Sequence, residues 1–82
     1  MNSEYANIPE MTLDALTRYV EKRIPTGGFL RAVLTNDLMG AMAKADIANQ
    51  EALPSICKYV YNRVPSGCWG NEEIVDSWLK RN

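Results

Sequence analysis

The chain has 82 residues, of which 46% are hydrophobic and 23% are charged, and its formal net charge at pH 7 is −1. This length accommodates one small hydrophobic core, and the ordinary hydrophobic fraction argues against a disordered chain. The near-neutral charge disfavours broad binding to nucleic-acid phosphates, and the sequence lacks the run of about 18 apolar residues that a membrane span needs. The chain contains no histidine, which removes most metal sites and most general-base chemistry. Its carboxylates are dispersed near helix starts and no pair stands out as acid and base, so we expect no metal site, no catalytic residues, no cofactor and no enzymatic activity.

The spacing of apolar residues predicts an all-α fold, a small bundle of four to five short helices. We expect an N-terminal arm over residues 1–11 and a single helical domain over residues 12–82. The first helix is expected to begin at Thr12 as N-cap and to end before Pro25. Its apolar stripe follows the periodicity of one helical face.

The second helix is expected to begin at Thr26 as N-cap. Asn36 is either a break or the N-cap of a third helix, so the second and third helices are either separate or one bent helix. Gly40 is interpreted as a residue that lets helices approach closely.

The fourth helix is expected to begin at Asn49, which places Pro54 in the first turn, where a proline is tolerated. It ends before Pro65. The last helix is expected to begin at Asn71 as N-cap and to end in Lys80 and Arg81.

The chain matches itself when it is shifted by 40 positions, because RYVEKRIPTGGF from Arg18 lies on KYVYNRVPSGCW from Lys58. This match predicts two helix-hairpin repeats, over about residues 12–48 and 52–82. Convergent helix-stop residues are the alternative explanation. The repeat predicts that two apolar stripes meet in the core: Leu13, Leu16, Val20 and Ile24 against Leu53, Ile56, Val60 and Val64.

The repeated Arg-apolar-Pro-[Ser/Thr]-Gly corner is a candidate anion site, because glycines expose backbone N–H groups and guanidinium groups bind carboxylates and phosphates. The candidate ligand-binding residues are Arg23, Thr26, Gly27, Gly28 and Arg31, with the repeat mates Arg63, Ser66, Gly67 and Trp69. In the alternative interpretation, the glycines serve only the turn geometry and the arginines only cap their own helices.

A second candidate surface is a protein interface formed by Met39, Met42 and Tyr61. Methionine adapts to varied partners, and Tyr61 falls off the apolar stripe of its helix, so we expect it to be exposed. Tyr19, Tyr59 and Trp78 are expected to be partly buried in the core.

The two cysteines, Cys57 and Cys68, are interpreted as reduced thiols, with a single disulfide between them as the alternative. Two cysteines without a histidine make a poor zinc site and a poor nucleophile.

The stretch IPTGGFLRAVLTNDLMGAMAKAD, with Asn49 and the VPSGCWG…SWL segment that follows, resembles a family of short proteins carried by phages and other bacterial mobile elements. The resemblance extends from about Thr12 to Leu79. Its signature positions here are Pro25, Gly27–Leu30, Val33, Leu34, Asn36, Asp37, Ala45, Asp46, Asn49 and Trp78. The resemblance implies action in the bacterial cytoplasm during infection or lysogeny, where accessory proteins of this size often act as stoichiometric binders.

Together these features predict a non-enzymatic phage-type accessory protein that binds and sequesters an anionic, nucleotide-like ligand and so counters a host process. The alternative is a protein–protein interaction module that inhibits or adapts a host or phage protein. We expect a homo-oligomer in the cytoplasm of a bacterial host cell, without a nucleic-acid or membrane partner.

Overall fold

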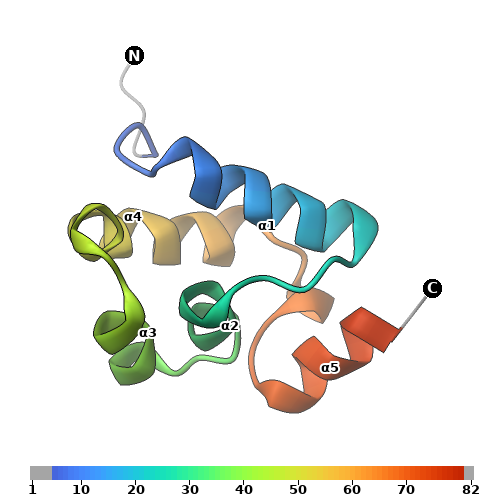
Figure 1. Ribbon diagram of the computed structural model, residues 1–82. Coiled ribbons are helices and arrows are strands. Elements are labelled where there is room, and N and C mark those ends of the chain that lie inside the picture. The colour runs from blue at the N-terminus through green and yellow to red at the C-terminus, as the bar shows by residue number, and fades with distance from the viewer. Residues whose placement is uncertain (1–4, 81–82) are drawn as a thin grey trace.

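The computed structural model describes residues 5–80, and within this range the chain forms five α-helices, one 3₁₀ turn and no strand. The predicted all-α fold is therefore confirmed (Figure 1). No helix in the described range has the length and apolar character needed to cross a membrane. The elements in chain order are α1 (Glu10–Lys22), α2 (Gly28–Leu34), α3 (Leu38–Lys44), α4 (Ile47–Arg63), the 3₁₀ turn η1 (Ser66–Cys68) and α5 (Glu72–Lys80).

Helix α1 begins at Glu10, two residues before the predicted start, and Pro9 is its N-cap. The carbonyl of Pro9 accepts the N–H groups of Thr12 at 3.0 Å and of Leu13 at 3.1 Å, so the first turn forms without a side-chain cap. The prediction that Thr12 is the N-cap was wrong, because Thr12 lies inside the helix and is only 7% exposed.

Helices α2 and α3 are separate. The N-cap of α2 is Gly27, which corrects the assignment to Thr26, whose hydroxyl instead donates to the Gly27 carbonyl at 3.1 Å. The break between the two helices is Asn36, which has a φ of 67°, and Asp37 then caps α3 by accepting the N–H of Gly40 at 3.0 Å. A Cβ atom at Gly40 would collide with the Asp37 carboxylate, so this glycine accommodates the cap rather than a neighbouring helix.

Helix α4 begins at Ile47 after the N-cap Asp46, which accepts the N–H of Asn49 at 2.9 Å. The prediction that Asn49 is the cap was therefore wrong. The earlier start places Pro54 in the helix interior rather than in the first turn, where its ring offers no N–H to the carbonyl of the preceding turn. The last N-cap was predicted correctly, since Asn71 accepts the N–H of Ile74 at 2.8 Å and α5 begins at the next residue.

The core lies between α1 and α4, which run side by side in Figure 1, with α2, η1 and α5 closing it from below. The predicted meeting of the two apolar stripes is confirmed for Leu16, which shares one buried cluster with Ile56, Val60 and Val64. It fails for Ile24, which is 42% exposed. Ile24 follows Arg23, whose left-handed backbone ends α1 and turns the chain off the stripe.

Part of the predicted N-terminal arm belongs to the core. Ile8 is 5% exposed within the buried cluster, and the ring of Tyr5 meets that of Tyr59 edge-on with centroids 5.2 Å apart. Residues 1–4 of the arm and Arg81 of the last predicted helix lie outside the described residues.

Tyr19 links three elements and is more deeply buried than predicted, at 1% exposure. Its hydroxyl donates to the carbonyl of Cys68 at 2.6 Å, which ties α1 to η1. Its own carbonyl accepts the indole N–H of Trp78 at 2.9 Å, which ties α1 to α5. These contacts hold the carboxyl end of α1 against the second half of the chain.

The backbone does not confirm the predicted repeat. After Arg23 the chain runs extended to α2 at Gly28, whereas after Arg63 it enters the 3₁₀ turn and begins α5 only at Glu72. Shifted back by 40 positions, α5 lies over residues 32–40, across the break between α2 and α3. The likeness of the two halves is thus confined to α1 and α4, and the backbone differs at the corners that follow them.

Candidate functional site

The two arginines of the repeated corners lie in different surroundings. Arg23 is half-buried, and its guanidinium carbon lies 4.1 Å from the ring centroid of Trp78. Arg63 is exposed, and its guanidinium carbon lies 5.5 Å from the ring centroid of Tyr5. Trp78 belongs to α5 and Tyr5 precedes α1, so each arginine covers an aromatic ring from a different part of the chain, and the structure does not bring the two arginines together around one ligand.

Arg31 already has anionic partners. Its guanidinium donates to the Asp76 carboxylate at 2.9 Å and lies 4.0 Å from the carboxylate of Glu72. Gly28 and Arg31 line one small hollow of about 200 Å³ together with Lys44. Two carboxylates of α5 therefore balance the cation on which the predicted anion site depends.

The remaining residues of the predicted anion site are spread over separate surfaces. Gly27 lines a cavity between α1, α2 and α4, whereas Gly67 lines a hollow beside α5. Ser66 is exposed at the start of η1, and Trp69 lines a hollow beside α4. None of the hollows described for residues 5–80 gathers more than two members of the predicted set.

The residues of the predicted protein interface do lie on adjoining hollows. The first hollow, of about 470 Å³, lies between α3 and α4, and its walls carry no charged side chain. Three of its side chains are large, apolar and exposed: Leu38 by 57%, Met39 by 80% and Met42 by 46%. The residues that line it are Leu38, Met39, Met42, Gln50, Leu53, Pro54 and Cys57.

The second hollow, of about 380 Å³, continues along α4 from the first, and Cys57 lines both. Tyr61, which is 74% exposed as its off-stripe position predicted, meets the ring of Trp69 edge-on with centroids 6.0 Å apart. The indole nitrogen of Trp69 is buried and has no hydrogen-bond partner among the described residues. The residues that line this hollow are Val33, Asn36, Cys57, Val60, Tyr61 and Trp69, none of which is charged. We call the two hollows together the α3–α4 face.

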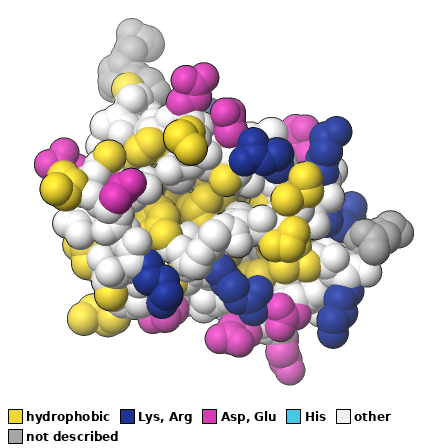
Figure 2. All heavy atoms as spheres, viewed as in Figure 1, with side chains coloured by type: hydrophobic (Ala, Val, Ile, Leu, Met, Phe, Trp, Pro, Cys, Tyr) yellow, Lys and Arg dark blue, Asp and Glu magenta, His cyan; other side chains and the backbone are white. Residues whose placement is uncertain are grey.

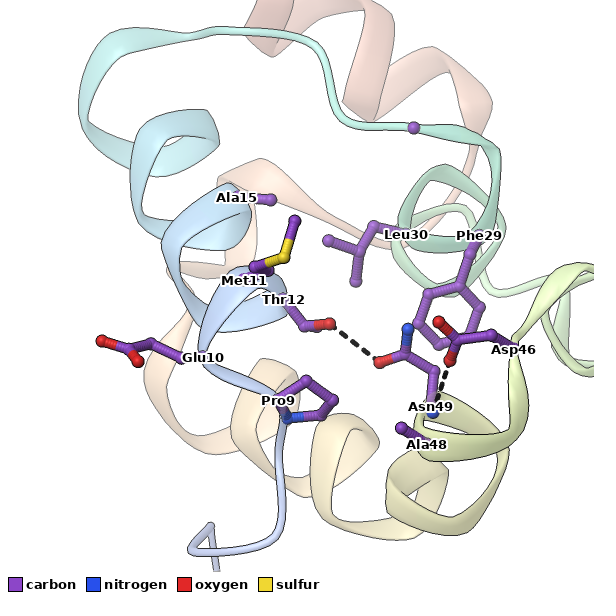
Figure 3. Close-up of a pocket in the computed structure, with 11 residues that line it drawn as sticks. Pro9, Glu10, Met11, Thr12, Ala15, Phe29, Leu30, Asp46, Ala48 and Asn49 are labelled. Atoms are coloured by element: carbon purple, nitrogen blue, oxygen red, sulfur yellow. Dashed lines mark hydrogen bonds between the residues drawn. The ribbon is translucent and has the colours of Figure 1, made fainter.

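A further cavity of about 520 Å³ lies between the amino ends of α1, α2 and α4. Figure 2 shows its hydrophobic floor as side chains gathered in the depression beneath α1, and Figure 3 shows its walls. Phe29 and Leu30 form one wall, and Thr12 donates a hydrogen bond to Asn49 across the floor at 2.8 Å. The charged residues that line it, Glu10 and Asp46, are both acidic.

Neither cysteine forms a disulfide within the described residues, and Cys57 is exposed whereas Cys68 is buried. Partial burial of the Cys57 thiol raises its pKa, so at neutral pH it is the protonated form that borders the α3–α4 face. Among residues 5–80, no cluster of three or more His, Cys, Asp or Glu side chains is placed to hold a metal ion.

Comparison of the chain with protein-family models, with curated proteins and with solved structures found no match. The resemblance to short phage proteins therefore remains a prediction.

Sequence reasoning missed Cys57 on the α3–α4 face, and Asp46 and Asn49 at the cavity. A signal existed for Cys57, since it lies four residues before Tyr61, a spacing that places two side chains near one another on a helix. No such signal existed for Asn49, whose partner Thr12 lies 37 residues away in the sequence.

Proposed function

We propose that this protein is a non-enzymatic interaction module that docks a host or phage protein through the α3–α4 face. The observation that carries the proposal is the uncharged lining of two adjoining hollows that also expose Leu38, Met39, Met42 and Tyr61. Contiguous exposed apolar surface of this kind marks interaction sites in small proteins. Charged side chains are depleted at the centre of protein interfaces, whereas methionine and aromatic residues are enriched there.

The shape of the face suits an amphipathic helix. Two helices of this chain form the walls of the first hollow, and an incoming helix presents anchors at intervals of three and four residues that such a groove can accept. Met39 and Met42 lie three residues apart on α3 and adapt to the anchors by changing rotamers.

Pro54 gives independent support. It interrupts the hydrogen-bond ladder of α4 and lines the first hollow. A proline in a helix interior destabilises the helix, and departures from local sequence rules are expected at functional sites.

The contribution of one anchor follows from its exposure. Met39 is 80% exposed, and complete burial of a methionine side chain stabilises a complex by about 1.5–3 kcal/mol. Replacing it with serine is therefore expected to weaken docking by about 1–2 kcal/mol, or roughly 5- to 30-fold in affinity.

A pull-down from phage-infected bacterial cells, with quantitative mass spectrometry, tests the proposal. Met39→Ser and Tyr61→Ala are expected to reduce the captured partner at least fivefold. Met11→Ser is the matched control, because Met11 is equally exposed, at 82%, but lies on α1 at the other cavity. Equal capture by the Met39 and Met11 variants would contradict the proposal.

Self-association would use the same uncharged face, and burial of a small domain's apolar surface against a second copy is a known route to stability. Native mass spectrometry of the purified chain distinguishes a second copy of this chain from a different protein as the occupant of the face. A monomer supports a different protein as the partner. A dimer that dissociates on Met39→Ser, without a captured protein, would show that the face joins copies of this chain instead.

A further inference from the structure

We propose that the cavity between the amino ends of α1, α2 and α4 binds an uncharged planar nitrogen heterocycle whose edge presents an N–H donor beside a carbonyl acceptor. The lactam edge of a hypoxanthine or guanine base has this chemistry. The site goes beyond the proposed docking function, since it shares no lining residue with the α3–α4 face.

The size and walls of the cavity suit a small organic ligand. Its volume of about 520 Å³ falls within the range of ligand pockets, which are mostly apolar with a few placed polar groups. Phe29 offers a flat aromatic wall, and Leu30 and Met11 extend the apolar surface from Phe29 toward α1 (Figure 3). An aromatic ring beside apolar side chains favours a planar ligand over a flexible one.

The donor of the site is the amide nitrogen of Asn49. The Thr12 hydroxyl, in a side chain only 7% exposed, donates to Asn49 Oδ1 at 2.8 Å and so fixes the orientation of the amide. In Figure 3 the amide nitrogen points away from Thr12, toward the side on which Phe29 and Leu30 lie. It is thus placed to donate to a ligand carbonyl.

The acceptor of the site is the carboxylate of Asp46. One carboxylate oxygen accepts the N–H of Asn49 at 2.9 Å in the helix cap. The second oxygen lies on the same side as the Asn49 amide nitrogen in Figure 3. The Asn49 amide donor and the Asp46 carboxylate acceptor lie side by side, so together they match a ligand edge that carries a carbonyl acceptor beside an N–H donor. The hydrogen bond from the ligand N–H to the carboxylate is of the stronger kind, because its acceptor is charged.

Charge determines what the cavity excludes. Glu10 and Asp46 are both acidic, and no lysine or arginine lines the cavity. A phosphate in the cavity would lie near the Asp46 carboxylate without a balancing cation, which costs binding free energy. The cavity therefore favours a base or nucleoside over the corresponding nucleotide, and the anionic ligand expected from the glycine-arginine corners does not suit it.

Titration of the full-length chain with inosine, followed by amide chemical shifts in NMR, tests the inference. Inosine is expected to shift the signals of cavity residues and to bind at least tenfold more tightly than adenosine, whose base lacks the lactam edge. Inosine 5′-monophosphate is expected to bind more weakly than inosine. No shift at the cavity with millimolar inosine, or equal binding of inosine and adenosine, would overturn the inference.

Three substitutions make the test specific. Asp46→Asn retains the helix cap, because asparagine caps as well as aspartate, and it replaces the free acceptor with a donor. Asn49→Asp removes the amide donor. Each is expected to weaken inosine binding at least tenfold, whereas Asp37→Asn, the same change at the cap of α3 and away from the cavity, is expected to leave it within twofold. An equal loss with Asp37→Asn would overturn the inference, and circular dichroism confirms that each variant is folded.

Discussion

The substitution Tyr19→Phe removes one buried hydroxyl and leaves the ring in place. That hydroxyl donates to the Cys68 carbonyl at 2.6 Å, and Tyr19 is only 1% exposed. Without it the Cys68 carbonyl loses this donor, and loss of a buried hydrogen bond costs about 1–3 kcal/mol. A domain of this length has a total stability of about 4–12 kcal/mol, so the loss is a large share. The thermal midpoint is expected to fall by roughly 4–8 °C for each kcal/mol lost.

The same hydroxyl makes stability depend on pH. Burial raises the pKa of Tyr19 to about 12 in the folded chain, above its ordinary value of 10.0. The folded state thus favours the neutral phenol, and this contribution is complete below pH 10 and is lost as the pH rises through 12. A shift of two pKa units corresponds to about 2.7 kcal/mol.

Urea unfolding of the wild type and of Tyr19→Phe, at pH 8 and at intervals from pH 10 to 12, measures both effects. The difference in unfolding free energy is expected to be about 1–3 kcal/mol at pH 8 and to shrink steadily above pH 10, because the variant has no phenol at this position. Comparison at each pH cancels the titration of other groups. A difference that stays constant up to pH 12, or no difference at pH 8, would refute the role assigned to the hydroxyl.

Three further results are expected. Pro54→Ala should raise the unfolding free energy by about 1–3 kcal/mol in urea, because alanine restores an N–H inside α4; a loss of stability would contradict this. A thiol reagent should react with Cys57 in the folded chain and with Cys68 only on unfolding, as counted by absorbance; reaction of both thiols in the folded chain would contradict the burial of Cys68. Arg23→Ala should cost about 1 kcal/mol and Arg63→Ala less than about 0.5 kcal/mol; equal losses in urea would favour the repeat.

Much of the fold could be predicted from local patterns. Apolar spacing indicated helices throughout, and the meeting of α1 with α4 could be predicted because their stripes share one period. The N-cap Asn71 is followed by two acidic residues and then by a clear apolar run, so no other residue competed with it for the N-cap position.

Helix starts with competing caps were harder to predict. Asp46 and Asn49 both cap well, and in the structure it is Asp46 that accepts the N–H of Asn49 and begins α4. The wrong choice of N-cap for α4 led to a second error, because a helix start at Asn49 places Pro54 in the first turn rather than in the helix interior. Thr12 was wrongly predicted to be a cap. Its burial beside Asn49 depends on a contact between distant parts of the chain, which local sequence patterns do not reveal.

The candidate site divides in the same way. The exposure of Tyr61 followed from its place on the helical wheel, which is local information. The surroundings of Arg23 and Arg63 depend on the aromatic ring that each one contacts, Trp78 for Arg23 and Tyr5 for Arg63. Each ring lies far from its arginine in the sequence. The sequence match between the two halves therefore predicted similar corners, but it could not predict the surroundings of the two arginines.

Site-specific photo-cross-linking in bacterial cells during infection tests the docking role of the α3–α4 face most directly. A photoreactive phenylalanine placed at Met39 is expected to yield a covalent adduct with one partner protein, and the same group placed at Met11, which is equally exposed, is expected to yield none. An adduct from Met11 alone, or no adduct from either position, would contradict the account.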